Sequence, residues 1–283
     1  MKSNSLNTLL ITGASTGIGR ACALHMTSLD WRVFAGVRKE TDGEALRAAA
    51  SPNLTPVFLD VTDSKSISSA AGIVAEAVGP DGLSGLVNNA GIPLGGPIEF
   101  LDLDRVRAQF EVNVFGVLAV TQAFLPLLRL GRGRIVNISS ISGLVAAPFV
   151  SPYSASKFAL EAFSDSLRLE VRRWGIHVSV VEPGAIATPI WDKAGSVVAD
   201  LVSEASPETL ELYGSAIQSM RGRFAPHGIP AEQAARVVAR ALTDGKPRAR
   251  YPVGLEGRIA TLFRRLPDGL RDWILARQLP KWE

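Results

Sequence analysis

The chain has 283 residues and a mass of 30.1 kDa, and its 47% hydrophobic and 20% charged residues are ordinary for a globular protein with a large core. The net charge of +3 is small and the basic residues are scattered, so the composition predicts no nucleic-acid partner, and we assign no metal site. A single cysteine, Cys22, excludes an internal disulfide, and no secretory hydrophobic segment precedes the first glycine, so we expect a cytoplasmic protein.

Strands and helices are predicted to alternate through the first half of the chain. Apolar runs predict strands at 6–12, 32–37, 54–61 and 83–89, and the segments between them have helical patterns, one of which covers 64–78. Strands that alternate with helices of about a dozen residues are typical of right-handed βαβ units. The pattern therefore predicts a parallel sheet with helices on both faces.

The second half continues this alternation. We predict one long helix from about 103 to 130, a strand that begins at Ile135, a helix that extends to Trp174 and a strand at 177–181. The uncharged run 112–128 contains polar residues and a proline, so we interpret it as a buried helix. The pattern is irregular between 195 and 229, and a helix at 231–242 and a short strand near Tyr251 follow. A long, loosely patterned insertion before the last strand is interpreted as a substrate lid.

A glycine loop follows the first predicted strand. Gly13, Gly17 and Gly19 lie between that strand and a helix, which is the position that a dinucleotide-binding loop requires. The same segment, Gly13-Ala14-Ser15-Thr16-Gly17, also matches the G-x-S-x-G pattern that positions the nucleophile of α/β-hydrolases. That alternative needs Ser15 to be joined by an acid and a histidine, for which His177 and His227 are the distant candidates.

A second cluster of reactive side chains follows the strand at Ile135. Tyr153 and Lys157 are four residues apart in a predicted helix, so phenol and ammonium share one helical face. Because a free tyrosine has a pKa near 10, a fixed cation nearby is the simplest way to make it a usable acid or base. Ser139 and Ser140 end the strand just before, where a loop could bring a hydroxyl to the same place.

Taken together, these motifs resemble the short-chain dehydrogenase/reductase family. The resemblance rests on TGASTGIG at 12–19, Asp60, Asn88-Asn89-Ala90-Gly91, Asn113, Ser140, Tyr153-x-x-x-Lys157 and Pro183-Gly184 with Thr188, in the family's order over residues 6–190. It implies one α/β domain over 1–283, with a three-layer Rossmann fold and a doubly wound, mostly parallel seven-stranded sheet with helices on both faces. Within it, about 186–229 would be the substrate-lid insertion and about 254–283 a C-terminal helical extension.

The resemblance also implies catalytic roles. Tyr153 would be the general acid in reduction or the base in oxidation, and Lys157 would lower the pKa of Tyr153 and hold the ribose of the nicotinamide half. Ser140 would orient the substrate, and Asn113 would hold the water that links Lys157 to solvent. A protein of the same fold that only senses the cofactor and binds a partner is the non-enzymatic alternative. Such a protein would have no need to keep Tyr153, Lys157, Ser140 and Asn113 together, so their presence favours an enzyme.

The resemblance implies a cofactor site as well, and one residue indicates which cofactor. The second predicted strand ends in Val37-Arg38-Lys39 with no acid before Glu40, so Arg38 favours NADP(H), with NAD(H) as the alternative. By resemblance Asp60 and Val61 would contact adenine, and Thr188 would hold the carboxamide or phosphates. The other cofactor-binding positions that the motifs imply are Gly13, Ser15, Thr16, Gly17, Ile18, Gly19, Asn89, Ala90, Gly91, Tyr153, Lys157, Pro183, Gly184 and Ile186.

The predicted substrate pocket is apolar. Besides Ser140 and Tyr153, its candidate positions are Leu144, Val145, Phe149, Ile190 and Trp191, which include no cation to pair with a substrate carboxylate. We therefore expect a hydrophobic secondary alcohol or ketone of steroid, retinoid or lipid type. The tail from Arg250 to Pro267 resembles the extension of the steroid, retinol and hydroxybutyrate dehydrogenases of this family.

The tail contains an amphipathic segment. Its apolar stripe consists of Leu255, Ile259, Leu262, Phe263 and Leu266, with Arg258, Arg264 and Arg265 outside it. We expect this stripe to pack on its own domain rather than on a membrane surface. By resemblance, the helices around Asn113 and Tyr153 would form the interface of a homodimer or homotetramer.

Overall fold

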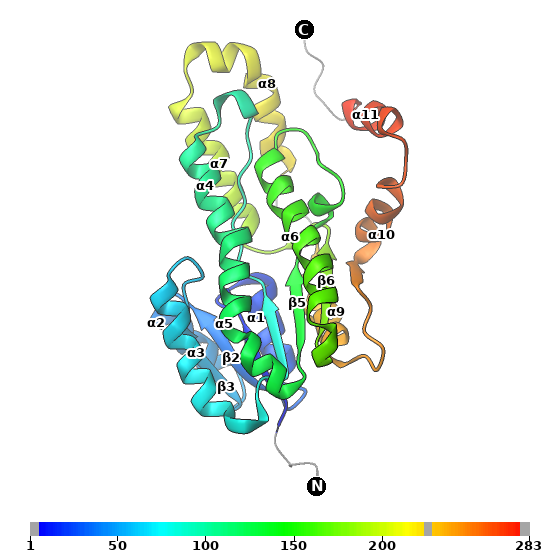
Figure 1. The fold of residues 1–283 in the computed structure, drawn as a ribbon. Helices are drawn as coiled ribbons and strands as arrows, with labels where there is room; N and C mark the ends of the chain where they lie inside the picture. The colour runs from blue at the N-terminus through cyan, green and yellow to red at the C-terminus, as the bar shows by residue number, and fades with distance from the viewer. Residues whose placement is uncertain (1–5, 224–227, 278–283) are drawn as a thin grey trace.

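Seven parallel strands form the central sheet of the protein, in the order β3-β2-β1-β4-β5-β6-β9 (Figure 1). The computed structural model describes residues 6–223 and 228–277, apart from the side chains of 191–193, 197 and 219–223. The strands are β1 (Thr8–Ile11), β2 (Arg32–Val37), β3 (Leu54–Phe58), β4 (Gly85–Asn88), β5 (Arg134–Ile138), β6 (His177–Pro183) and β9 (Arg250–Val253). The strand order reverses between β1 and β4, which confirms the predicted doubly wound sheet and places the switch point beside the glycine loop.

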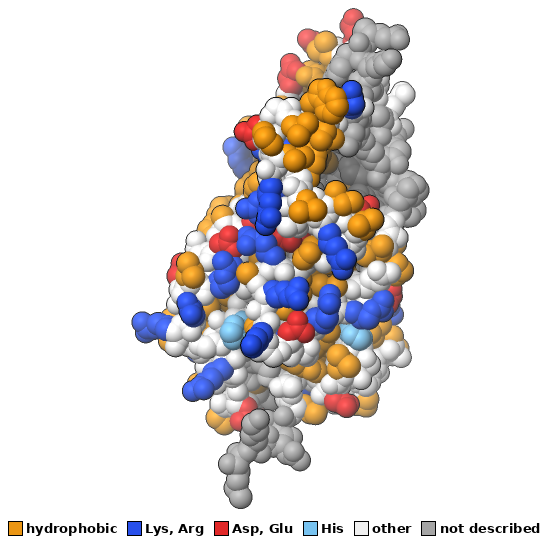
Figure 2. All heavy atoms as spheres, turned by 90° about the vertical axis from the view of Figure 1, so that its right-hand side faces the viewer, with side chains coloured by type: hydrophobic (Ala, Val, Ile, Leu, Met, Phe, Trp, Pro, Cys, Tyr) orange, Lys and Arg blue, Asp and Glu red, His pale blue; other side chains and the backbone are white. Residues whose placement is uncertain are grey.

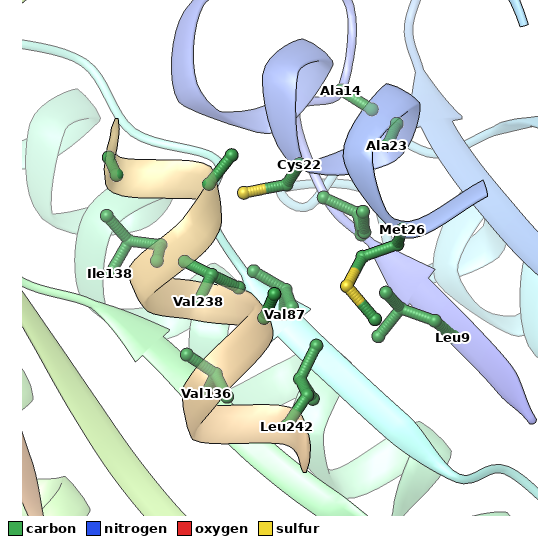
Figure 3. Packing of buried hydrophobic residues seen from close by; sticks show 14 of the residues in the cluster. Leu9, Ala14, Cys22, Ala23, Met26, Val87, Val136, Ile138, Val238 and Leu242 are labelled. Carbon is green, nitrogen blue, oxygen red and sulfur yellow. The ribbon is translucent and has the colours of Figure 1, made fainter. Parts of the chain in front are cut away.

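Helices cover both faces of this sheet. One face carries α1 (Gly17–Thr27), α2 (Glu40–Ala49) and α9 (Ala231–Thr243), and the other carries α3 (Ser64–Val78), α5 (Gly116–Gly131) and α6 (Ser151–Glu170). On the first face, Cys22 and Met26 of α1 pack beside Val238 and Leu242 of α9 (Figure 3). The predicted helix through Trp174 ends earlier, at Glu170, and a short 3-10 turn, Arg172–Trp174, follows it.

The long helix predicted from 103 to 130 is interrupted. The structure has α4 (Leu103–Phe110), a π-helical turn (Glu111–Phe115) and then α5. A π turn inserts an extra residue into the helical ladder, and such turns occur frequently at functional sites. By length and composition the whole helical stretch could span a membrane, yet α5 buries Phe124 and Leu128 against the sheet, as the prediction of a buried helix requires.

The insertion before the last strand is more regular than the sequence pattern suggested. It contains the short strand β7 (Ile186–Ala187), two helices, α7 (Ile190–Glu204) and α8 (Pro207–Arg223), and β8 (Ile229–Pro230), which pairs with β7. Val198 and Ile217 form a small apolar cluster between the two helices. Outside this cluster, α7 and α8 bury few side chains. They therefore need few regularly spaced apolar residues, which explains why the sequence pattern of this segment looked irregular.

The C-terminal helices α10 (Gly254–Phe263) and α11 (Asp268–Ala276) correct one expectation. Most of the apolar stripe does not pack on its own domain, because Leu255, Ile259 and Leu262 are 72%, 54% and 64% exposed, whereas Phe263 and Leu266 are half-buried. The face of α10 that touches the domain instead consists of Gly257 and Ala260. A Cβ on Gly257 would lie 3.0 Å from the Glu182 carbonyl oxygen, so the helix approaches the sheet too closely for large side chains there.

Candidate active site

The glycine loop is tied to the end of β4 by hydrogen bonds. The Thr12 hydroxyl accepts from the backbone N–H groups of Asn89 and Ala90, each at 2.9 Å. The Asn89 side-chain amide donates to the carbonyl oxygens of Thr12 and Gly13, at 3.0 and 2.9 Å. These bonds bring the predicted cofactor positions Gly13, Asn89 and Ala90 together at the carboxyl ends of β1 and β4, where Rossmann folds bind dinucleotides.

Each glycine of the loop has a steric reason to be glycine. Gly13 and Gly17 have φ values of +63° and +56°, which disfavour other residues. A Cβ on Gly19 would lie 2.4 Å from both the Gly13 carbonyl oxygen and the Asn89 Nδ2. At Gly17 a Cβ would come within 3.2 Å of Thr188, so the predicted phosphate or carboxamide position lies against the loop.

The start of α1 fits an anionic group. Thr16 precedes the helix without capping it through its side chain, and the first turn, Gly17-Ile18-Gly19, carries no acidic residue. Backbone N–H groups and the positive end of the helix dipole are therefore available to a pyrophosphate. By contrast, Asp63 caps α3 with its own carboxylate. The loop and helix together fit the phosphates of a dinucleotide.

The adenosine end of the predicted site lies after β2 and β3. The Asp60 carboxylate accepts hydrogen bonds from the backbone N–H and hydroxyl of Thr62, at 2.9 and 2.8 Å. Burial acts to raise the pKa of Asp60, but these bonds and the charge of Arg38 outweigh it, and the pKa lies below its usual value. Arg38 is thus close enough to Asp60 for their charges to interact. Val61, the second predicted adenine contact, is buried beside Gly116.

Tyr153, Lys157 and Ser140 meet at the carboxyl end of β5. The Lys157 Nζ lies 5.7 Å from the centre of the Tyr153 ring and donates a 2.8 Å hydrogen bond to the Ile138 carbonyl oxygen. The Ser140 hydroxyl accepts from the Ser142 N–H at 3.1 Å and caps the 3-10 turn that follows β5. The sequence prediction that these side chains share one place is therefore confirmed.

The pKa of Tyr153 shifts in the direction opposite to the one expected. Burial raises the pKa of Tyr153 above its usual value of 10, and the hydrogen bond with Ser140 opposes this only in part. The lowering expected from Lys157 does not outweigh this burial, and the Lys157 ammonium donates its hydrogen bond to the Ile138 carbonyl oxygen. Burial lowers the pKa of Lys157 to about 8, and the charge of Glu161 opposes this. The chain by itself therefore holds Tyr153 as a protonated phenol.

Asn113 lies fully buried within the π turn, and its side chain links two parts of the site. Its Oδ1 accepts from the Ile92 N–H at 2.8 Å, and its Nδ2 donates to the Ile92 carbonyl oxygen and to the Ser156 hydroxyl at 3.0 and 3.1 Å. Ser156 in turn donates to the Tyr153 carbonyl oxygen at 2.7 Å. Both amide hydrogens of Asn113 are thus engaged by the protein. Its side chain positions the segment after β4 against α6.

The predicted substrate positions differ in accessibility. Val145, Phe149 and Ile190 are half-buried, whereas Leu144 is fully buried and so contributes to the packing beneath. The side chain of Trp191 lies outside the described part of the structure. Phe149 packs against the α7–α8 cluster and has a φ of +66°, which is rare for a bulky residue and typical of strained segments at functional sites. The helices α7 and α8 and the segment after β5 therefore share an apolar contact.

The loop that carries Pro183, Gly184 and Ile186 is joined to the C-terminal extension. The Glu256 carboxylate of α10 accepts a 2.7 Å hydrogen bond from the Ala185 N–H, and a Cβ on Gly184 would collide with that carboxylate. Ile186 is buried, and Thr188 follows it against the glycine loop. This connection brings a residue from the end of the chain to the predicted nicotinamide end of the site.

The structure does not assemble the hydrolase alternative. Ser15 follows the carboxyl end of β1, whereas His177 is exposed at the amino end of β6, on the opposite edge of the parallel sheet. His25 lies in the last turn of α1, and His227 lies outside the described residues. The described histidines therefore provide no base for Ser15.

Sequence reasoning missed several residues that support the site. Thr12, Ser156 and Glu256 hold the loops described above through side-chain hydrogen bonds. The buried Glu161 and the half-buried Arg250 form an ion pair one helical turn beyond Lys157. The position of Glu161, four residues after Lys157, was the one signal in the sequence that could have indicated a partner.

Known proteins resemble the whole chain. A family model described as short chain dehydrogenase matches residues 7–198. The chain is 38% identical to 17-beta-hydroxysteroid dehydrogenase type 6 of Bos taurus and to retinol dehydrogenase 5 of Homo sapiens, in each case over 96% of this chain and 89% of the relative. A short-chain dehydrogenase from Burkholderia cenocepacia, crystallised in complex with NADP, superposes with a TM-score of 0.72 at 27% identity, over 98% of this chain and 99% of the other. The chain thus belongs to the short-chain dehydrogenase/reductase family and is an oxidoreductase.

Proposed function

We propose that the protein transfers a hydride between NADP(H) and a hydrophobic secondary alcohol or ketone, with Tyr153 as the proton donor or acceptor. The observation that carries this proposal is the meeting of Tyr153, Lys157 and Ser140 at the carboxyl end of β5, beside a glycine loop that fits a dinucleotide. When bound, the nicotinamide supplies or accepts the hydride. The chain must then place the substrate oxygen and move one proton.

Each proposed catalytic residue has one task. Ser140 donates a hydrogen bond that orients the substrate oxygen toward Tyr153, and the Tyr153 hydroxyl gives its proton to that oxygen in reduction or takes it in oxidation. Lys157 holds the ribose hydroxyls and stabilises negative charge that develops on the Tyr153 oxygen. Because burial keeps Tyr153 protonated in the chain alone, the site is poised to donate a proton. Asn113 keeps α6 in register with the loop after β4.

The preference for NADP(H) rests on Arg38 at the end of β2, where NAD-dependent Rossmann enzymes commonly place an acid. A guanidinium there can form charge-assisted hydrogen bonds to a 2′-phosphate. We expect Arg38→Ala to weaken NADPH binding by about 10- to 100-fold, the equivalent of one or two such bonds, and to change NADH binding little. Fluorescence titration with both cofactors measures this, and equal losses for the two would contradict the assignment.

The proposed substrate class rests on the apolar lining and on the relatives. Val145, Phe149 and Ile190 carry no charge, and Phe149 contacts the lid cluster of α7 and α8. Two relatives are named for hydroxysteroid and retinol oxidation. We therefore propose a steroid-, retinoid- or lipid-like substrate under the lid. A panel of such alcohols and ketones, followed at the nicotinamide absorbance with NADPH and NADH in parallel, tests both proposals, and turnover restricted to small charged hydroxy acids would exclude this class.

We propose a homodimer or homotetramer, working in the cytoplasm. Three phenylalanines on the α5–α6 side of the molecule, Phe115, Phe158 and Phe163, are 52%, 43% and 41% exposed, which is unusual for large apolar side chains on neighbouring helices. A second copy that packed on these helices would cover them.

The proposed cytoplasmic setting rests on the single cysteine, Cys22, a buried free thiol that has no partner for an internal disulfide.

Because the stripe of α10 faces outward, we also propose that it contacts an anionic membrane surface. Leu255, Ile259 and Leu262 are exposed, and Arg258 and Arg265 lie exposed beside them. On this side of the molecule, hydrophobic side chains gather above a region of Lys and Arg side chains (Figure 2). Such a combination is typical of helices that lie in a membrane interface. If two copies of the chain met at this face about a two-fold axis, the arginines of one copy would face those of the other, and their like charges would repel.

Ile259→Glu tests this surface, with Ile73→Glu as the matched control, since Ile73 is an equally exposed isoleucine on the distant helix α3. We expect the wild-type protein to sediment with vesicles that contain phosphatidylglycerol, and Ile259→Glu to reduce the partition at least about fivefold. Ile73→Glu should change it little. If the wild-type protein stayed in solution, the proposed membrane contact would be rejected. If Ile259→Glu instead halved the mass measured by light scattering, the face would be a contact between two copies of the chain.

A further inference from the structure

A cluster of charged side chains lies one helical turn beyond Lys157 on α6, and two of its carboxylates are buried. It contains Glu161 and Asp165 of α6, Glu182 of β6 and Arg250 of β9. None of these four residues belongs to the glycine loop or to the proposed catalytic group. The cluster joins the catalytic helix to the last two strands of the sheet.

Arg250 is the centre of this cluster. Its Nη2 lies 3.0 Å from Glu161 Oε2 and 2.8 Å from Asp165 Oδ2, and its Nε lies 3.3 Å from Glu182 Oε1. The Nε also donates a 3.1 Å hydrogen bond to Glu161 Oε2. A single guanidinium thus fixes the Glu161 carboxylate by two contacts, so the orientation of this side chain is well defined.

Three carboxylates contact Arg250, and two of them are buried, whereas the half-exposed Asp165 is also paired with Arg168 at 2.7 Å. Glu161 and Glu182 are 6% and 1% exposed, and neither Glu161 Oε1 nor the Glu182 oxygens accept a hydrogen bond from the described residues. Burial and the nearby Glu161 raise the pKa of Glu182 to about 7. A buried negative charge that is only partly compensated is costly for stability alone. Glu161 lies four residues after the buried Lys157 on α6, and this spacing points to a role in the site.

Glu161 is placed to act on Lys157. The two residues are four apart on α6 and share one helical face, with Glu161 on the side of Lys157 away from Tyr153. Lys157 is 5% exposed, and its ammonium donates to the Ile138 carbonyl oxygen. Burial disfavours the charged amine, and the Glu161 carboxylate is the group that opposes this. Burial raises the pKa of Glu161, and Ser139 and Arg250 oppose this. The charged and titratable groups that bear on Lys157, directly or through Glu161, are Tyr153, Glu161, Asp165 and Arg168 of α6, Glu182 of β6, Arg250 of β9 and Arg264 after α10.

We propose that Glu161, held in place by Arg250, is a positioning residue whose negative charge keeps the Lys157 amine protonated beneath Tyr153. The proposal rests on the proposed function, because it assumes that a charged Lys157 is needed for proton transfer. It also assigns β9 a part in the site, since Arg250 comes from the last strand of the sheet. Glu161 contacts neither substrate nor cofactor and acts only through Lys157.

Titration of Lys157 by NMR tests the proposal without turnover. The chain has seven lysines, so protein labelled with ¹³C-lysine gives few signals, and Lys157→Met assigns the relevant one. We expect the Lys157 midpoint near pH 8 in the wild type and about one pH unit lower in Glu161→Gln, because the opposing charge is lost. The decline of kcat at high pH should likewise begin at lower pH in Glu161→Gln. At pH 8.5 kcat should therefore fall about tenfold, whereas kcat at pH 6 and KM should stay near the wild-type values.

Two further variants control this test. Glu161→Asp keeps the charge and should restore most of the wild-type midpoint. Glu170→Gln makes the same chemical change at an exposed position of α6 and should leave the midpoint unchanged. Glu161→Gln is expected to fold, because Arg250 retains Asp165 and Glu182 as partners.

A Lys157 midpoint that is the same in wild type and Glu161→Gln would overturn the proposal, even if the variant were inactive. Should Glu161→Gln not fold, the wild-type protein still gives an answer. Its Lys157 signal should show a second, smaller inflection at acid pH when Glu161 takes up a proton, and a single inflection would reject the coupling. A failure of the proposed function would be distinguishable from this result. In that case Tyr153→Phe would remain active while Lys157 titrated as expected.

Discussion

Tyr153→Phe is expected to lower kcat by about 10²- to 10⁴-fold, which is the usual contribution of a positioned general acid or base. The variant removes one oxygen and keeps the ring, so the packing against Lys157 is preserved. Because the glycine loop is held by Thr12 and Asn89, the cofactor dissociation constant should change by less than about threefold. Steady-state kinetics and cofactor fluorescence titration measure the two effects.

Tyr251→Phe provides the matched control, because it makes the same change at a buried tyrosine of β9. The Tyr251 hydroxyl accepts from the Arg248 N–H and donates to Asp244, at 3.0 and 3.1 Å, and takes no part in the site. We expect this variant to lose about 1 kcal/mol of stability and to keep its turnover. Residual activity in Tyr153→Phe above about a tenth of wild type would mean that another group transfers the proton.

Gly19→Ala is expected to produce the second large effect, on stability and cofactor binding together. Its Cβ would lie 2.4 Å from both the Gly13 carbonyl oxygen and the Asn89 Nδ2, so the loop and the end of β4 would have to separate. Overpacking of this kind costs about 1–3 kcal/mol. The displaced loop should also weaken cofactor binding at least about tenfold. Urea unfolding and cofactor titration give both quantities.

Gly72→Ala is the control for this substitution. Gly72 lies in the interior of α3, and a Cβ there would meet nothing within 4 Å. Alanine should therefore stabilise the helix by about 0.5–1 kcal/mol and leave cofactor binding unchanged. If Gly19→Ala were as stable as wild type and bound cofactor equally well, the steric explanation of the loop would be wrong.

Much of this protein could be predicted from local signals in the chain. The alternation of strands and helices depends on residues a few positions apart, so the parallel sheet followed from periodicity, and its doubly wound arrangement was implied by the family motifs. The four-residue spacing of Tyr153 and Lys157 likewise indicated one helical face. The π turn at Asn113 left no such signal, and the contacts of its buried side chain are with Ile92 and Ser156, in segments far from it in the chain.

The sequence by itself thus determined the fold class, the glycine loop and the pairing of Tyr153 with Lys157, because each depends on spacing along one element. Only the tertiary structure decided how burial changes the acidity of Tyr153 and which charge supports Lys157. It also decided that α10 turns Gly257 inward and Leu262 outward. Desolvation, ion pairing and close packing depend on groups far apart in the chain, as Glu161 and Arg250 are, and no local pattern encodes them.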